Sequence, residues 1–406
     1  MHYSEVTLRE PYTDIKGKMK IEKLLNQLIE PIERSNYVGW DVFDGLNSKL
    51  FKKTFIYKSR FFRLLWIQLF KKSPVNFRGL FFVKKGYNAK GLALFMQGFI
   101  NLYKATNNIR YFNKGYNLAG ILKKIRSKRS EYYCWGYNFD WESIAYYVPE
   151  NKPNMIVSSF VAQAFLDLYE VDNNEEWLNI AIDVSKFIQT ELLLYEKNDE
   201  LCFGYIPNET PRVHNANLMG AKLFARLYSY TKDEKYKLLS KKSVNYTVNR
   251  QNNNGSWVYG QEKHWQWIDN FHTGFILMAI KEYEIYSKDY TYEKNIADGL
   301  KFHINNHYDE YFIPKYYNKK KNPLDIHNFA QGIITFLTFG DLEKAKKLAR
   351  IAINTMWDNK KNYFYYQKTK LYTNKNNYIR WSQAWMFAAL SKLLLYQIRN
   401  EDENLV

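Results

Sequence analysis

A short motif that begins with Leu-Tyr returns several times along the chain, and it constrains the fold more than any other feature. The copies LYKATNNIRYF, LYEVDNNEEWL and LYSYTKDEKYK begin at Leu102, Leu168 and Leu227 and align without gaps. A shifted copy ends on Tyr292, and a degenerate fifth copy begins at Phe339. The aromatic residues that close the first four copies lie 66, 59 and 56 residues apart. Such a period indicates repeated supersecondary units.

Each repeat has the pattern of a helical hairpin. A first helix ends in Leu-Tyr, a turn of Asn, Asp or Lys follows, and a second helix comes next, as in 175–194 and 234–251. Apolar residues recur every three or four positions, which is the helical period. A stretch rich in Gly, Pro and aromatic residues then suits a small β-hairpin. The first helices are predicted to open at Asn88, Ser158, Asn215, His272, Asn328 and Trp381.

The composition of these helices predicts how they are arranged. The first helices are rich in Gly, Ala and Ser and poor in charge, so we expect them to be the inner ones, with the charged second helices outside. Neither end of the array looks like a polar capping repeat. We therefore predict an all-α fold, a closed (α/α)6 toroid with short β-hairpins in the rim loops. It is placed over 81–406, after a basic and partly helical N-terminal extension, 1–80.

The net charge of +18 is concentrated near the N-terminus. Residues 45–130 hold 20 Lys and Arg and no acidic residue, which leaves 59 − 20 = 39 basic against 41 acidic residues elsewhere. Within this region Lys58–Lys72, KSRFFRLLWIQLFKK, is an apolar segment with basic flanks. It is consistent with a helix lying on an anionic membrane face, and equally with a buried helix that has solvated ends. No recognition motif accompanies the charge, so nucleic acid is not an expected partner.

The chain contains no obvious targeting or metal-binding pattern. Its start has no apolar signal core, and no apolar run approaches the roughly 20 residues of a membrane helix. We therefore expect a cytoplasmic protein, with a peripheral contact at the inner membrane face as an alternative. Cys134 and Cys202 belong to neither a CxxC nor a Cys-His pattern, so we expect no disulfide framework or structural zinc. No cofactor is predicted.

The loops that precede the inner helices should meet on one rim, where helix N-termini favour anions. The densest stretch, Asn254–Phe275, holds three Trp and two His with a Glu and an Asp. Aromatic rings beside titratable groups suit a polar, ring-shaped ligand such as a sugar, whereas the alternative is a Trp-rich turn that plugs the bundle. Comparable polar-aromatic loops cover 134–143, 203–217, 314–328 and 376–385.

Two kinds of chemistry fit these loops. Paired carboxylates serve glycoside hydrolysis, while a Tyr or His base with a cation serves proton removal beside a uronate carboxylate. The predicted catalytic residues are Asp140, His214, Asp269, His272, Tyr316, Asp325, His327 and Arg380. The predicted substrate-binding residues are Trp135, Trp141, Asn215, Trp265, Trp267, Asn270, Lys315, Trp381 and Gln383. The competing roles are helix capping for each Asp and core packing for about half of the Trp.

A metal site is a further option at two positions. Asp269 with His272, and Asp325 with His327, are residue types that ligate metals. Neither spacing is a strong zinc signature, so no metal is predicted.

Five motifs resemble a known family. CWGYNFDWES, VHNANLMGAKLFARLY, GSWVYG followed by WIDNFHTGF, PKYYN with PLDIHNFAQ, and YIRWSQAWMF are similar to the VpsJ-like group of polysaccharide-biosynthesis proteins. The resemblance runs from about Gly39 to Tyr396 and keeps order and spacing. It implies an α/α toroid and a role in making a surface or exported polysaccharide, but it assigns no catalytic residue. Such toroids are more distantly similar to glycan lyases, uronyl C5-epimerases and hydrolases.

These observations leave three functional interpretations. The first is an enzyme, an epimerase, lyase or glycoside hydrolase, acting on a neutral or an anionic polysaccharide or oligosaccharide. The second is a non-catalytic binding or scaffold subunit of a membrane-associated assembly complex, which the basic N-terminal region favours. The third is a terpenoid cyclase-like toroid, because Gln251–Trp257, QNNNGSW, matches a turn of terpene cyclases. Clustered, partly buried Asp, His and Arg favour the enzyme.

Overall fold

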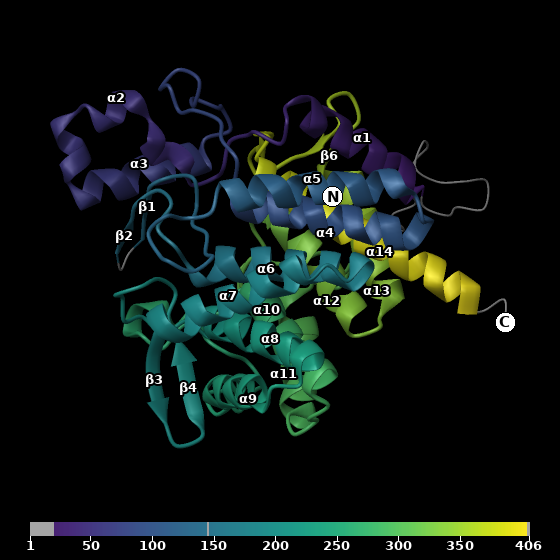
Figure 1. Cartoon of the computed structure of the whole chain (residues 1–406). Coiled ribbons are helices and arrows are strands. Elements are labelled where there is room, and N and C mark those ends of the chain that lie inside the picture. Colours follow the sequence, from purple (N-terminus) through teal and green to yellow (C-terminus); the bar gives the residue numbers. More distant parts are fainter. Residues whose placement is uncertain (1–19, 144–145, 404–406) are drawn as a thin grey trace.

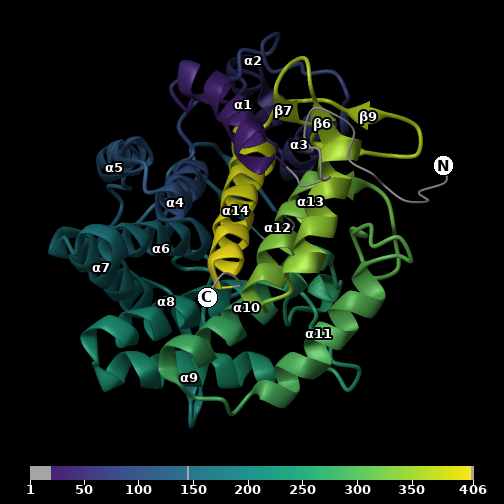
Figure 2. The same ribbon diagram turned by 90° about the vertical axis from the view of Figure 1, so that its right-hand side faces the viewer.

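The computed structural model describes residues 20–143 and 146–403, and it shows a ring of paired helices. Each inner helix packs against the next, and α14 packs against α4, so the ring is closed. Figure 2 looks at this ring with the inner helices surrounding the centre and their partners outside. The predicted (α/α)6 toroid is therefore confirmed. The inner helices are α4 (Ala89–Thr106), α6 (Met155–Asp172), α8 (His214–Thr231), α10 (Asn270–Ser287), α12 (Ile326–Thr338) and α14 (Trp385–Glu403).

The outer layer carries the second helix of each hairpin and one helix from the start of the chain. That helix, α1 (Ile21–Arg34), packs on α14 and buries Leu24, Leu25 and Leu28 completely. It takes the outer position beside the last inner helix, so the two ends of the described chain meet in one hairpin-like pair. The predicted division at residue 80 stays a prediction. The other outer helices are α5 (Ile109–Lys124), α7 (Glu175–Glu191), α9 (Glu234–Val248), α11 (Glu293–His307) and α13 (Leu342–Met356).

The repeated Leu-Tyr motif encodes the turn between an inner and an outer helix. In the first copy Asn107 ends α4 in the left-handed conformation, with φ of 53°, and the side chain of Asn108 then caps α5. Asparagine tolerates both tasks because its short amide can hydrogen-bond the local backbone. The later copies repeat the geometry, with Asn173 and Asn174 before α7 and Lys232 and Asp233 before α9.

The starts of the inner helices also have identifiable causes. Asn88, Asn154, Asp269 and Asp325 each accept a backbone hydrogen bond as N-caps, and the helices begin within a few residues of their predicted openings. The last inner helix differs, because α14 begins at Trp385 and follows a π-helical turn, η4 (Ile379–Ala384). Such turns are rare and occur frequently at functional sites.

Short antiparallel strands occupy several rim loops, as predicted. β1 pairs with β2 before the inner helix α6, and β3 pairs with β4 before α8. In a third sheet β5, which precedes α12, pairs with β8 of the hairpin that precedes η4. The strands are β1 (Trp141–Glu142), β2 (Tyr147–Val148), β3 (Leu193–Lys197), β4 (Glu200–Phe203), β5 (Leu324–Asp325), β6 (Trp357–Asp358), β7 (Tyr363–Phe364), β8 (Gln367–Lys368) and β9 (Thr373–Asn374).

A small helical subregion covers the end of the ring at which the inner helices begin (Figure 1). A buried guanidinium anchors it, because Arg78 donates from Nε to Asp44 over 2.6 Å and from Nη1 to the Tyr378 hydroxyl over 2.9 Å. The subregion consists of η1 (Asp44–Asn47), α2 (Lys49–Lys52), η2 (Phe55–Lys58) and α3 (Arg60–Lys72). No helix within 20–143 or 146–403 is long and apolar enough to span a bilayer.

Candidate functional site

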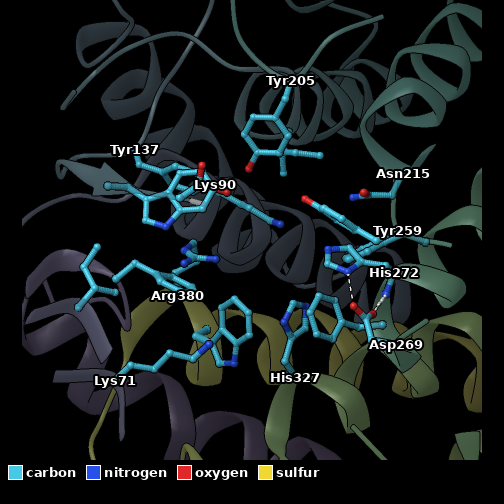
Figure 3. A pocket seen from close by; sticks show the side chains of 18 of the residues that line it. Lys71, Lys90, Tyr137, Tyr205, Asn215, Tyr259, Asp269, His272, His327 and Arg380 are labelled. Carbon is cyan, nitrogen blue, oxygen red and sulfur yellow. Dashed lines mark hydrogen bonds and ion pairs between the residues drawn. The ribbon is translucent and has the colours of Figure 1, made fainter. Parts of the chain in front are cut away.

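A cavity of about 340 Å³ opens at the end of the toroid where the inner helices begin. Its lining comes from the first turns of α4, α6, α8, α10 and α12, from η4 before α14, and from α3. Figure 3 shows the central side chains directed toward one space. The polar and charged residues of the lining include Lys71, Lys90, Tyr137, Glu142, Tyr205, Asn215, Tyr259, Asp269, His272, Tyr316, His327 and Arg380.

Asp269 and His272 form a pair at the start of α10. Asp269 Oδ1 accepts the His272 backbone N–H over 2.9 Å, and Oδ2 lies 2.7 Å from His272 Nδ1. Trp267 Nε1 donates to the same Oδ2 over 3.0 Å, so the carboxylate is held in place. Because Nδ1 is engaged by the carboxylate, Nε2 is the ring nitrogen left for a ligand. The arrangement resembles an imidazole base oriented by a carboxylate.

His327 lies beside this pair and has a different environment. Its ring stacks on Phe271 at 4.8 Å between centroids and meets Trp381 edge-on at 4.5 Å. Neither ring nitrogen has a hydrogen-bond partner among the described residues. Burial lowers the pKa of His327 well below 6.5, and the charges of Lys90 and Arg380 lower it further. The imidazole is therefore neutral at neutral pH and keeps an N–H that can donate to a ligand.

Lys90 projects from the first turn of α4 into the floor of the cavity. Its ammonium lies 4.1 Å from the ring centroid of Phe160 and 5.1 Å from that of Trp385. Burial lowers the pKa of Lys90 well below 10.5, and the neighbouring charge of Arg380 acts in the same direction. In Figure 3 its nitrogen points toward the same space as the hydroxyl group of Tyr205.

Arg380 is the cation of the cavity wall that has a complete partner. Its Nε and Nη2 both donate to the Asp41 carboxylate over 2.7 Å, a bidentate pair. Its guanidinium also lies 5.1 Å from the Tyr137 ring. This pair fixes the η4 turn against the N-terminal subregion, so Arg380 presents a rigid positive edge to the cavity.

Aromatic side chains make up most of the wall. Trp267 stacks on Tyr259 with 4.6 Å between centroids and 12° between planes. Trp141, Trp265 and Trp381 also line the cavity, as the sequence predicted for them. Burial raises the pKa of Tyr205 and Tyr259, so both phenols stay protonated and can donate hydrogen bonds. The result is a mostly apolar space with a few fixed polar groups, which is the usual character of a small-ligand site.

Three of the predicted catalytic residues do not line this cavity, and the expectation that they share it is wrong. Asp140 accepts hydrogen bonds from Tyr57 and the Glu150 backbone and an ion pair from Lys52, which all lie outside the cavity. His214 is buried between Gln261 and Thr247. Asp325 caps α12 and accepts hydrogen bonds from Gln367 and Trp381.

The reason is the same in each case. A rim position brings a residue near the cavity, but its hydrogen-bond partners decide where the side chain points. The carboxylate oxygens of Asp140 and Asp325 accept hydrogen bonds from protein donors. This is the helix-capping and pairing role that was the alternative to a catalytic role. Burial lowers the pKa of His214 to about 3, so it is a neutral core imidazole. The described residues contain no group of three or more His, Cys, Asp or Glu arranged to hold a metal ion.

The other predicted positions divide in a similar way. Asn215 and Tyr316 line the cavity, and Asn215 Oδ1 is buried without a partner in the described part of the chain. Four predicted substrate-binding residues do not line the cavity: Trp135, Asn270, Lys315 and Gln383. Trp135 is a core residue that donates to the Leu122 carbonyl, and Asn270 donates to the His307 carbonyl. Gln383 is hydrogen-bonded to the Phe364 backbone.

Sequence reasoning missed several residues of the wall, above all Lys90, Tyr137, Tyr205 and Tyr259. Lys90 carried a usable signal, because it is an isolated charge in the opening turn of a helix otherwise rich in Gly, Ala and Leu. The tyrosines carried no comparable signal, since the chain contains 35 of them.

A second cavity, of about 330 Å³, lies at the opposite end of the ring. Its charged residues include Lys104, Asp167, Glu170, Lys222, Arg226, Glu282 and Lys392. Phe160, Met219 and Phe275 line both cavities. These three side chains therefore lie between the two cavities, and we call them the septum of the toroid.

Comparisons with known proteins find relatives in fold only. No protein-family description matches the sequence, and no curated protein matches it. The structure is similar to cellobiose 2-epimerase from Bacillus thermoamylovorans, with a TM-score of 0.62, 13% identity, and coverage of 77% of this chain and 88% of that one.

Two further structures give the same picture. A D-mannose isomerase has a TM-score of 0.57 at 14% identity, covering 76% of this chain and 87% of its own. A family 76 glycoside hydrolase, a mannosidase from Bacteroides thetaiotaomicron, has a TM-score of 0.58 at 12% identity, covering 82% and 92%. At such identities the likeness shows the toroid fold alone.

Proposed function

We propose that this chain is a carbohydrate-active enzyme that moves a proton at a carbon atom beside a carbonyl group of a saccharide. The observation that carries the proposal is the Asp269–His272 pair facing a cavity in which a neutral imidazole, His327, stands beside it. The structural neighbours named for sugar epimerisation and isomerisation support the substrate class.

The chemistry follows from the placement of the side chains. His272 Nε2 removes the proton from the carbon, the C–H electron pair forms a carbon–carbon double bond, and the carbonyl π pair moves onto oxygen. A neutral N–H from His327 can stabilise the enolate oxygen without first losing a proton to it. Return of the proton to the neighbouring carbon, with transfer of the adjacent hydroxyl proton to the former carbonyl oxygen, gives isomerisation, and delivery of a proton to the opposite face of the same carbon gives epimerisation.

Glycoside hydrolysis is less well supported by the same geometry. It requires two carboxyl groups, one able to donate a proton and the other to act as base or nucleophile. Asp269 and Glu142 are the carboxylates of the described cavity lining. Glu142 forms ion pairs with Arg63 at 2.6 Å and Arg60 at 3.6 Å, and Asp269 is engaged by His272 and Trp267.

A second candidate is proton removal beside a uronate carboxylate, as in uronyl epimerases and lyases. The cavity lining favours it through the amines of Lys71 and Lys90, whose protonated forms a bound carboxylate would stabilise, whereas the guanidinium of Arg380 is already paired with Asp41. The role in surface-polysaccharide synthesis that the VpsJ-like resemblance implies stays a prediction and is compatible with either reaction.

Hydrogen exchange into deuterated water distinguishes the two candidates in one experiment. The purified protein is incubated in D2O with a free aldose such as mannose, with cellobiose, and with uronic-acid oligosaccharides, and proton NMR follows each C–H signal. Loss of the signal at carbon 2 of the aldose supports the first candidate, and loss at carbon 5 of the uronate supports the second.

His272→Ala should slow exchange by about 10²- to 10⁴-fold, the usual contribution of a general base. His264→Ala is the matched control, since His264 is an exposed histidine of the same loop outside the cavity. If neither substrate exchanges deuterium with the wild-type protein, or if both variants exchange at the wild-type rate, the proposal is wrong.

A further inference from the structure

Helix α3 presents an unusual surface to solvent. Its outward face carries Phe61, Phe62, Leu65 and Leu69, with exposed fractions of 68%, 38%, 55% and 47%. On a helical period these four residues share one arc, and Ile67 and Phe70 are buried on the opposite side. A surface helix normally turns its polar side outward, so α3 is apolar on both sides.

This exposure is concentrated in one part of the molecule. Of the 18 strongly exposed large apolar or aromatic side chains in the described chain, nine lie between residues 50 and 82. Besides the four residues of α3, these nine include Leu50, Phe55, Val75, Leu80 and Phe82. Figure 1 shows α2 and α3 at the edge of the molecule. Contiguous exposed apolar side chains mark interaction surfaces in soluble folds.

The exposed charged residues around this face that lack an ion-pair partner in the described chain are all basic. Lys53, Lys58, Lys72 and Lys84 are exposed and form no ion pair with any residue that the structure describes. No acidic residue occurs anywhere in 45–130. The partner must therefore accept apolar side chains and supply negative charge over the same area.

We propose that the outward face of α2 and α3 docks on an anionic lipid bilayer. Phenylalanine and leucine side chains enter the boundary between headgroups and acyl chains while the surrounding lysines meet anionic headgroups. A nucleic acid would use the lysines but leave the apolar side chains in water. A second copy of this chain would bring two surfaces of the same positive charge together.

The same helix forms part of the cavity wall, which places docking next to the candidate site. Leu64, Gln68 and Lys71 of α3 line the cavity from the arc adjacent to the outward face, and the buried Ile67 lines it as well. Docking of α3 would thus hold the end of the toroid that contains the candidate cavity at the bilayer surface. The docking proposal does not depend on the reaction, because binding is measured without a saccharide.

The test is co-sedimentation of the full chain with vesicles of phosphatidylcholine, with and without phosphatidylglycerol. We expect binding to the anionic vesicles that weakens as salt is raised, because salt screens the lysine contribution. Leu65→Ser should lower the affinity about tenfold through the lost burial of one leucine. Lys72→Gln should lower it about fivefold through one lost headgroup contact.

Matched controls separate docking from general surface effects. Leu238 lies on an outer helix with an exposed fraction of 54%, nearly that of Leu65, and Lys301 is an exposed lysine of another outer helix. Leu238→Ser and Lys301→Gln should leave binding unchanged. Absence of wild-type binding to the anionic vesicles, or equal effects of Leu65→Ser and Leu238→Ser, would overturn the proposal. So would a concentration-dependent dimer, seen by analytical ultracentrifugation, that Leu65→Ser abolishes.

Discussion

The two ends of the toroid hold cavities of nearly equal size, about 340 Å³ and 330 Å³, and, apart from the Arg380–Asp41 pair of the near end, they differ in how their basic groups are partnered. At the far end Arg226 donates to Gln163, Asp167 and Glu170 over 2.7–2.8 Å, and Lys222 lies 2.6 Å from Glu282. At the near end His327 has no hydrogen-bond partner among the described residues, and Lys90 contacts aromatic rings.

This difference supports our placing the ligand at the near end. Charged groups that satisfy one another stabilise the packing of the inner helices and have little left to offer a ligand. Polar groups held in a buried place without partners cost stability, and such groups are common at functional sites. Cavity volume alone would not have separated the two ends.

Among substitutions that distinguish the two ends, we expect the largest change in reaction rate from Asp269→Asn at the near end. The amide can still cap α10, but it no longer holds a proton on His272 Nδ1 by charge, so the base loses its orientation and tautomer. We expect the rate of the proposed proton transfer to fall about a hundredfold or more, with little change in melting temperature. Deuterium exchange and calorimetry on one sample measure both. A large fall in melting temperature with an unchanged rate would assign the pair a structural role.

Arg226→Met makes the converse test at the far end. It removes a buried guanidinium and leaves Asp167 and Glu170 facing each other without their shared partner. We expect the free energy of unfolding to fall by roughly 2–4 kcal/mol, as for other broken buried pairs, while the reaction rate at a temperature well below melting is retained. Urea unfolding gives the free energy. A selective loss of activity would show that the far cavity also serves the ligand.

The two ends should also lose stability in different pH ranges. Burial lowers the pKa of His214, near the first cavity, from 6.5 to about 3, and lowers that of His327. The unfolded chain binds these protons below pH 6.5 while the folded chain does not, so stability falls as pH drops below 6.5.

At the far end burial alone would raise the pKa of Glu170, but the charges of Arg226 and Lys104 outweigh it and lower the value from 4.5 to about 2. Its contribution is present above pH 4.5 and is lost as pH falls from 4.5 toward 2. Melting temperatures measured across pH should show both declines, and Glu170→Gln should remove part of the second only. A single decline unaffected by that variant would contradict the assignment.

The smallest effect is expected from an aromatic wall residue. Trp267→Ala should weaken saccharide binding by about 1–3 kcal/mol if a sugar ring stacks on the indole, as aromatic stacking does for other planar ligands. Tyr286 lines the far cavity, and Tyr286→Ala should leave the affinity unchanged. Isothermal titration with the saccharide identified by exchange compares them. Equal losses would remove the distinction between the two ends.

The fold was largely predictable because its signals are local. Asn107 with Asn108, and Asn173 with Asn174, are neighbours in sequence, and each pair determines a turn without help from distant residues. The pairing of α1 with α14 carried no such signal, since the two helices come from opposite ends of the chain and no Leu-Tyr turn connects them.

The site was predictable only as far as its parts are local. Asp269 and His272 share one helix turn, so their pairing was readable from their spacing. Asp325 looked equivalent, but its carboxylate is taken by Trp381 and Gln367, which lie 56 and 42 residues away. Contacts between residues so far apart in the sequence are set by tertiary packing, and no pattern in the sequence predicted them.

The septum of Phe160, Met219 and Phe275 lies at the inner end of the near cavity and closes it there. Because these side chains fill the axis of the ring between the two cavities of the described chain, we do not expect a polymer to thread through the toroid. A ligand would then enter and leave the near cavity by the same opening, which favours the end of a long chain as the unit that reaches His272. Turnover on a polymer would consequently proceed by separate encounters with chain ends, without processive sliding.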